Sequence, residues 1–195
     1  MTLEGKKIGI LVEAGFEDSE LIVPLEAMKK AGARVVVIGN DLKQLYQGKR
    51  GNAEIKADIT ADRAKAEQFD AIIVPGGYAP DRMRLHQSMI ALINKGHRLG
   101  KIIAAICHGP QLLISAGIVR GRRLTSWPSI TIDLRNAGAH WVDEPVVIDR
   151  NIITSRKPAD LPAFNKAIKE ALTQPNGNNN GKLSKPAKRK VKAKR

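Results

Sequence analysis

The chain has 195 residues, of which 43% are hydrophobic, so it is long and apolar enough to build one domain with a sizeable core. The formal net charge is +14, but eight basic residues fall in the last twenty positions, which leaves +6 for the rest. One cysteine excludes an internal disulfide, and the first apolar run is interrupted too soon, by Glu13, for a signal peptide or membrane span. We therefore expect a cytoplasmic protein without a membrane partner.

Up to residue 116, apolar runs alternate with stretches of helical periodicity. After the first apolar run, for example, Leu21, Leu25 and Met28 fall on one helical face. The sequence predicts strands over residues 6–12, 34–38, 69–74 and 102–106, and helices over 19–31, 86–98 and 108–116. Because near-continuous apolar strands alternate with amphipathic helices, we expect an α/β domain with a parallel sheet and helices on both faces.

The following segment predicts an antiparallel edge for this sheet. Two short apolar runs, 146–148 and 152–154, flank the turn-like residues 149–151, which is typical of a hairpin. A last helix is predicted over residues 159–172. We therefore assign residues 1–174 to the α/β domain.

Residues 175–195 differ in composition, because Asn and Gly give way to Lys, Arg, Ala and Pro without apolar periodicity. Such a segment cannot bury enough surface to offset the entropy of ordering, so we expect a disordered tail. It is either a solubilising extension or a segment that binds nucleic acid phosphates non-specifically. In the second case the protein would be nucleoid-associated, or nuclear in a nucleated cell, with residues 186–192 as an import signal. The basic candidates are Lys185, Lys188, Arg189, Lys190, Lys192, Lys194 and Arg195.

Polar residues follow three of the predicted strands, at the edge where an open parallel sheet places its functional site. Acids follow the first strand, a glycine pair and an acid follow the third, and a Cys-His dipeptide follows the fourth. These residues are Glu13, Glu17, Asp18, Glu20, Gly76, Gly77, Asp81, Cys107 and His108. We expect them to converge at one edge of the sheet.

Cys107 is predicted to occupy a sharp turn from a strand into a helix, where a side chain projects outward. A helix N-terminus lowers the pKa of a cysteine, so we expect the pKa of Cys107 to lie below its ordinary value. Backbone N–H groups of Gly76, Gly77 and His108 are candidates to bind a developing oxyanion. The imidazole of His108 is a candidate general base or acid, and the small Gly109 relieves crowding at the turn.

Each of these residues also has a purely structural interpretation. A cysteine after an apolar strand can be a small buried hydrophobe, acids in a first helical turn can complement the helix dipole, and a glycine pair can form a plain turn. His86, His97 and His140 lack metal-ligand spacing with one another or with Cys107, and no glycine-rich phosphate-binding fingerprint is present. We therefore expect neither a metal nor a cofactor.

Several segments together resemble one superfamily. They are residues 15–20 (GFEDSE), 69–77 (FDAIIVPGG), 79–81 (APD) and, above all, 105–110 (AICHGP). In this order, and over about residues 6–172, the chain resembles the ThiJ/PfpI superfamily, most of all its branch of PfpI-type intracellular proteases and protein deglycases.

The resemblance implies a flavodoxin-like fold, also called class I glutamine amidotransferase-like, with Cys107 on a nucleophile elbow and His108 as its partner. It implies that an acid of the first loop, either Glu17 or Glu20, lies beside the cysteine. It also implies a homo-oligomer, a dimer or a hexamer, in which Asp81 orients the histidine across a subunit boundary.

The activity implied by the resemblance is that of a stress-type cysteine hydrolase. Its substrates would be methylglyoxal or glyoxal adducts of proteins or nucleotides, or the free dicarbonyl in a glyoxalase-like reaction. An intracellular cysteine peptidase is the enzymatic alternative. Two hypotheses belong to other classes: a redox-sensing or chaperone-like protein in which Cys107 is oxidised, and a nucleic-acid-associated protein that acts mainly through its basic tail.

Overall fold

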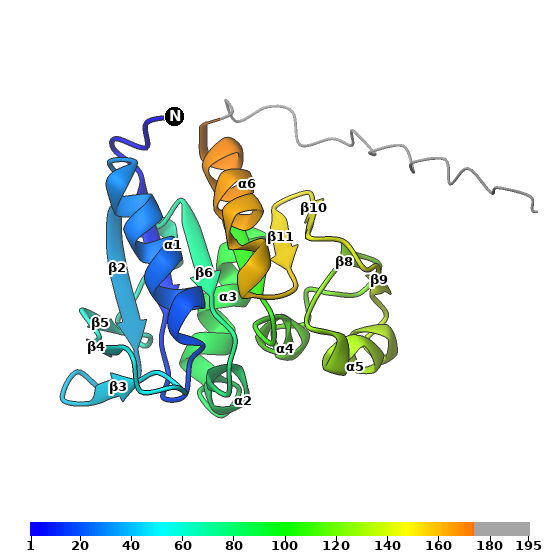
Figure 1. Cartoon of the computed structure of the whole chain (residues 1–195), viewed down its shortest axis with the longest axis horizontal. Helices are drawn as coiled ribbons and strands as arrows, with labels where there is room; N and C mark the ends of the chain where they lie inside the picture. The colour runs from blue at the N-terminus through cyan, green and yellow to red at the C-terminus, as the bar shows by residue number, and fades with distance from the viewer. Residues whose placement is uncertain (174–195) are drawn as a thin grey trace, which may run out of the picture.

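A seven-stranded sheet forms the centre of the computed structural model, which describes residues 1–173 (Figure 1). Its strands are β1 (Lys7–Leu11), β2 (Arg34–Gly39), β5 (Ile59–Thr60), β6 (Ala71–Val74), β7 (Ile102–Ile106), β10 (Val146–Asp149) and β11 (Ile152–Ser155). They follow the order β10-β11-β7-β6-β1-β2-β5. Neighbouring strands are parallel except at the edge, where β10 and β11 form the predicted antiparallel hairpin.

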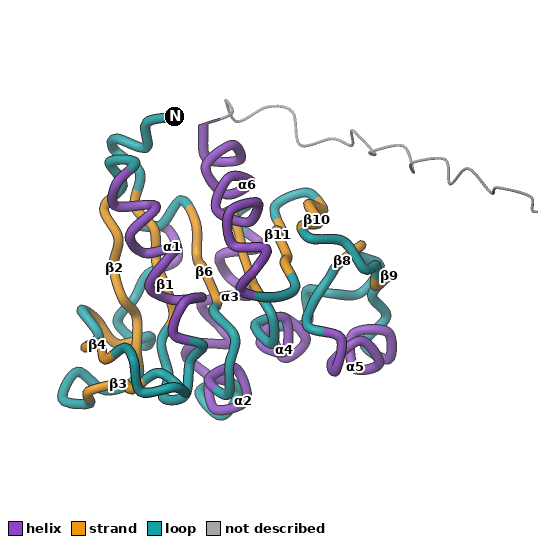
Figure 2. Tube along the Cα trace, viewed as in Figure 1, coloured by secondary structure: helices purple, strands orange, loops and turns teal. Residues whose placement is uncertain are grey.

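Helices cover both faces of this sheet. On one face α1 (Asp18–Lys30) packs against α6 (Leu161–Thr173), and on the other face α3 (Gln87–Arg98) packs against α4 (Pro110–Ser115) (Figure 1, Figure 2). The predicted α/β architecture with a doubly covered, mostly parallel sheet is thereby confirmed. Within residues 1–173, no helix has the length and the apolar character needed to cross a membrane.

Several short elements were not expected from the sequence. They are the hairpin of β3 (Leu45–Gln47) and β4 (Glu54–Lys56), the pair β8 (Arg123–Leu124) and β9 (His140–Trp141), the helices α2 (Ala79–Met83) and α5 (Thr131–Asn136), and the 3-10 turns η1 (Ala66–Gln68), η2 (Pro128–Ile130) and η3 (Pro158–Asp160). The short strand β5 was also missed. Elements of this length are too short for a periodic pattern, and long-range contacts decide their conformation.

The central strands are apolar throughout because both of their faces are covered. Every residue of β6 and β7 is buried, which explains why these strands read as continuous apolar runs. The register aligns their carboxyl ends, since Ile10 of β1 pairs with Ile73 of β6, and Val74 pairs with Ala105 of β7. The segments that follow β1, β6 and β7 therefore leave the sheet side by side, as the sequence predicted.

Candidate active site

Cys107 follows β7 directly and has a left-handed backbone conformation, with φ at 62°. A residue with a side chain pays about 1–3 kcal/mol for such a conformation, so the surrounding structure must hold it in place. The Cys107 N–H donates to the carbonyl of Ser155 (3.0 Å), and its carbonyl accepts from the N–H of Trp127 (2.9 Å). The turn into α4 is tight, because a Cβ at Gly109 would lie 2.5 Å from the carbonyl oxygen of Val74.

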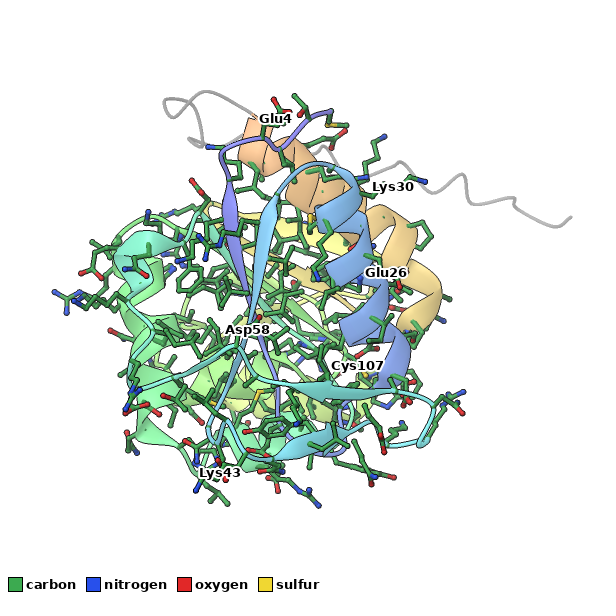
Figure 3. All side chains as sticks on the ribbon, turned by 90° about the vertical axis from the view of Figure 1, so that its left-hand side faces the viewer. Glu4, Glu26, Lys30, Lys43, Asp58 and Cys107 are labelled. Carbon is green, nitrogen blue, oxygen red and sulfur yellow. The ribbon has the colours of Figure 1, made fainter. Side chains whose placement is uncertain are left out.

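The thiol of Cys107 lies inside this turn, near the first turn of α1, and only 6% of the residue is exposed (Figure 3). Burial and the neighbouring carboxyl of Glu20 raise the pKa of Cys107 to about 12, although N–H groups of Gly77 and His108 act in the opposite direction. The prediction of a lowered pKa is therefore wrong for this structure. Burial and a nearby acid outweigh a helix of only six residues.

Glu20, not Glu17, is the acid that lies against the cysteine. Its Oε2 accepts a hydrogen bond from the N–H of Gly76 (2.9 Å), and its Oε1 has no hydrogen-bond partner within residues 1–173. Both Glu20 and Cys107 pack directly against the backbone of Gly76. A side chain at this position would not fit, because a Cβ there would lie 2.6 Å from both Glu20 Oε2 and Cys107 Cβ. Burial raises the pKa of Glu20 from 4.5 to about 8, so at neutral pH its carboxyl carries a proton that can be donated to sulfur.

His108 connects the thiol to a residue that the sequence did not indicate. Its Nδ1 lies 3.3 Å from Cys107 Sγ, and its Nε2 lies 3.1 Å from the hydroxyl of Ser129. Burial and the charge of Lys49 lower the pKa of His108, which favours a neutral imidazole. Trp127 stacks on this ring with centroids 6.4 Å apart. Ser129 was missed because it lies in a short turn that only folding brings to the site.

The expected oxyanion donors divide into two groups. The N–H of Gly76 is already bound by Glu20, so the expectation that it serves an oxyanion is corrected. The N–H groups of Gly77 and His108 both approach the sulfur, and neither donates to another group in the described part of the chain. These two N–H groups form a donor pair next to the Cys107 sulfur.

Asp81 lies beside a pocket of about 390 Å³ that opens next to His108. The pocket is lined by Gly77, Tyr78, Asp81, Arg82, His108 and Gln111. Within the described residues of one chain, Asp81 makes no hydrogen bond or ion pair with His108. Whether Asp81 contacts the histidine of a neighbouring subunit therefore stays a prediction.

Glu17 is turned toward the β3–β4 hairpin. Its buried carboxylate pairs with Lys49 (2.9 Å) and with Arg50 (3.4 Å), both of which lie in the turn between these strands. Asp18 holds the same turn, because its two carboxylate oxygens accept from the N–H groups of Arg50 and Asn52. The acids of the first loop thus have separate partners, and sequence reasoning did not identify Lys49 near the site.

Metal ligation has no geometric basis within residues 1–173, where no three His, Cys, Asp or Glu side chains form a possible metal site. His86, for example, lies 3.2 Å from a carboxylate oxygen of Glu13. The groups that surround Cys107 are acids, bases and N–H donors, and they suit proton transfer and attack by sulfur.

A buried cysteine on a strained strand-to-helix turn, with a neutral carboxyl and an imidazole beside it, is an arrangement that suits an α/β enzyme with a cysteine nucleophile. The chain belongs to the DJ-1/PfpI family, whose model matches residues 6–171. The family expected from the sequence and its flavodoxin-like fold are thus confirmed.

Relatives of similar length have names that describe deglycation. A protein of Escherichia coli named protein/nucleic acid deglycase 2 is 43% identical over 162 residues, which are 83% of this chain and 94% of that protein. A deglycase of Pyrococcus horikoshii is 43% identical over 166 residues, which are 85% of this chain and 99% of that protein. The similarity therefore extends over nearly the whole length of these relatives.

Solved structures show the same fold. A two-domain protein of Anabaena variabilis with DJ-1/ThiJ/PfpI-like and ferritin-like domains has a TM-score of 0.86 and 41% identity, over 92% of this chain and 52% of that one. DJ-1beta of Drosophila melanogaster has a TM-score of 0.80 and 30% identity, over 88% and 91% of the two chains.

Proposed function

We propose that this chain is a cysteine-dependent deglycase that hydrolyses methylglyoxal or glyoxal adducts of amino or thiol groups. The observation that carries the proposal is the contact between Cys107 Sγ and His108 Nδ1 (3.3 Å), beside the protonated carboxyl of Glu20. The names of the two deglycase relatives agree with this chemistry.

The first chemical step follows from the hydrogen bonds of His108. If Nε2 carries the proton and donates to Ser129, Nδ1 is free to accept the proton of the Cys107 thiol. The sulfur then bonds to the carbonyl carbon of the adduct, and the carbonyl electron pair moves to oxygen. N–H groups of Gly77 and His108 bind that oxygen, and the Glu20 proton stabilises the charge on sulfur before attack.

The test compares two substrates on the full chain. Adducts of methylglyoxal with N-acetylcysteine and N-acetyllysine are incubated with the wild type and with Cys107→Ser, and release of the free thiol or amine is measured. We expect release by the wild type and none by Cys107→Ser, because Ser lacks the thiolate. Release by both would overturn the proposal, and cleavage of peptides without adduct hydrolysis would favour the peptidase.

We also propose that the site is completed in a homo-oligomer, in which Asp81 approaches the His108 of the neighbouring subunit. Support comes from the position of Asp81, which lines the pocket beside His108 yet makes no bond to it among the described residues of one chain. Asp81→Asn should lower turnover without changing the mass measured by light scattering. Full activity of the protein diluted to a monomer would contradict this arrangement.

For the basic residues at 182–195, which lie outside the described residues, we propose binding to nucleic acid phosphates. The support is the composition, since eight Lys and Arg residues occur there without an acid. Such binding would be independent of sequence and would bring the enzyme close to nucleic acid, where glycated nucleotides could also be substrates.

A further inference from the structure

We propose that Lys49 is a positioning residue that places a positive charge at the edge of the site and favours the ionised form of the Cys107 sulfur. The inference rests on the proposed role of Cys107 as the nucleophile, and it adds a residue outside the Cys-His-Glu group. Lys49 lies in the turn between β3 and β4, far from the elbow in sequence.

The backbone holds this turn firmly against the first loop of the site. The N–H of Lys49 donates to the carbonyl of Phe16 (2.8 Å), and the N–H of Gly48 donates to the carbonyl of Ala53 (2.8 Å). Asp18 binds the next N–H groups of the turn from the start of α1, as described above. The position of the lysine Cα is therefore fixed by the same segment that carries the acids of the site.

The ammonium group of Lys49 is held between a buried acid and an aromatic ring. Its Nζ lies 2.9 Å from Glu17 Oε2 and 5.5 Å from the centre of the Tyr78 ring, and Tyr78 lines the pocket next to His108. About a third of the Lys49 side chain is exposed, at 31%, whereas 6% of the Glu17 side chain is exposed. The lysine thus neutralises a buried negative charge that would otherwise oppose ionisation of Glu20, the acid next to the thiol.

The charged and titratable groups near the thiol come from several elements. They are Glu17 and Glu20 from the start of α1, Lys49 from the β3–β4 turn, Tyr78, Asp81 and Arg82 from the segment after β6, and His108 from the elbow. The charge of Lys49 lowers the pKa of Glu20 and of His108. The pKa of Lys49 itself is raised mainly by its hydrogen bond to Glu17 and, to a smaller extent, by the Cys107 sulfur. One cation therefore acts on all three reacting groups.

Arg50 provides a matched control for this role. It also pairs with Glu17, at 3.4 Å, but its side chain is 63% exposed, and its charge is not among the causes of the Glu20 shift, whereas the charge of Lys49 is. If Lys49 acted only by holding Glu17 and the hairpin, Arg50→Met and Lys49→Met would have similar effects. If it acts on sulfur, only Lys49→Met should change the reactivity of the thiol.

The experiment measures alkylation of Cys107 by iodoacetamide, which needs no substrate and is unambiguous because the chain has one cysteine. Rates are recorded for the wild type, Lys49→Met, Lys49→Arg and Arg50→Met from pH 7 to pH 10, at low salt and in 1 M salt. At pH values below the pKa of the thiol, we expect Lys49→Met to react about 3–10-fold more slowly than the wild type. This factor corresponds to a rise of about half to one unit in the pKa of Cys107, which lowers the fraction of thiolate. We expect Lys49→Arg to recover part of the rate and Arg50→Met to match the wild type.

Salt gives a readout that a purely structural role would not move. Because the ammonium is partly exposed, high salt should slow alkylation of the wild type and reduce its difference from Lys49→Met. Equal rates for Lys49→Met and the wild type would overturn the proposal, as would equal losses in Lys49→Met and Arg50→Met. Should Lys49→Met fail to fold, a wild-type rate independent of salt would overturn it too. Loss of deglycase activity without slower alkylation would contradict the role of Lys49 on sulfur and leave the proposed function intact.

Discussion

At the scale of single residues, Glu20 has an unusual environment for a carboxyl group. It is fully buried, and within residues 1–173 its carboxyl oxygens accept a single backbone hydrogen bond, from the N–H of Gly76. A buried carboxylate with so few partners is costly, and the group avoids this cost by keeping its proton. Burial thus supplies a proton donor beside the Cys107 sulfur at neutral pH.

The retained proton makes a prediction for stability. In the folded chain the Glu20 carboxyl loses its proton only at about pH 8, whereas the unfolded chain loses it near 4.5. Between these values the folded state holds more protons, so the free energy of unfolding falls as the pH rises. Glu20→Gln removes this dependence, and its stability relative to the wild type should increase from pH 5 to pH 8. Each pKa unit corresponds to about 1.4 kcal/mol, so the gain is at most a few kcal/mol.

Urea unfolding at pH 5 and pH 8 measures this gain. The control is Glu26→Gln, an exposed acid on the same helix α1 (Figure 3), which should show no increase. If the free energy of unfolding changes with pH by the same amount in Glu20→Gln and in the wild type, the Glu20 carboxyl is already ionised in the folded protein and the prediction is wrong.

At the scale of elements, the sharp turn from β7 into α4 depends on Gly109. A Cβ there would lie 2.5 Å from the carbonyl oxygen of Val74 and 2.9 Å from that of Ile106, and neither backbone group can move easily. We expect Gly109→Ala to cost about 1–3 kcal/mol of stability through overpacking. Because relief of the clash would shift the turn, turnover of the folded variant should fall as well.

Gly100→Ala is the control for this prediction, since Gly100 precedes β7 at the opposite end and has open space around its Cα. Its φ of +72° makes an alanine there cost about 1–2 kcal/mol. Thermal unfolding and adduct hydrolysis of both variants are compared. Unchanged turnover per folded molecule in Gly109→Ala would show that the tight approach of the turn is not needed for the chemistry.

The long elements were predictable because burial on both sheet faces forces continuous apolar runs, such as those of β6 and β7. The convergence of acids, glycines and the Cys-His pair also followed from parallel topology. Which of the two acids, Glu17 or Glu20, lies against Cys107 depends on how α1 is rotated about its axis above Gly76, and no local sequence pattern encodes this rotation. Ser129 and Lys49 lie in short turns that long-range contacts position, and the burial that raises the Cys107 pKa is likewise a property of the folded chain.

At the scale of the whole molecule, the charge of the chain is concentrated outside the described residues. Eight basic residues between 182 and 195 predict strongly salt-dependent binding of DNA by the full chain. If all eight contact phosphates, the logarithm of the binding constant should fall with the logarithm of salt at a slope of about −7. The slope is measured by fluorescence anisotropy with a labelled duplex at several salt concentrations.

The comparison for this prediction is a chain that ends at Pro175. It should lose DNA binding and keep adduct hydrolysis, because Cys107, His108 and Glu20 all lie within residues 1–173. A full-length variant with the eight basic residues changed to Gln should behave in the same way. Equal DNA binding by all three proteins would assign the contact to the α/β domain instead.

The direction of α6 has a practical consequence for attachment of the enzyme. The helix runs back along the sheet and ends at Thr173 beside the N-terminus (Figure 1), whereas Cys107 follows the carboxyl end of β7, at the opposite end of the sheet (Figure 3). Anything tethered behind Thr173, whether a bead, a surface or a bound polymer, would be attached at the end away from the pocket. The enzyme immobilised through its C-terminus should therefore present its pocket to the solution and keep the Michaelis constant of the free protein.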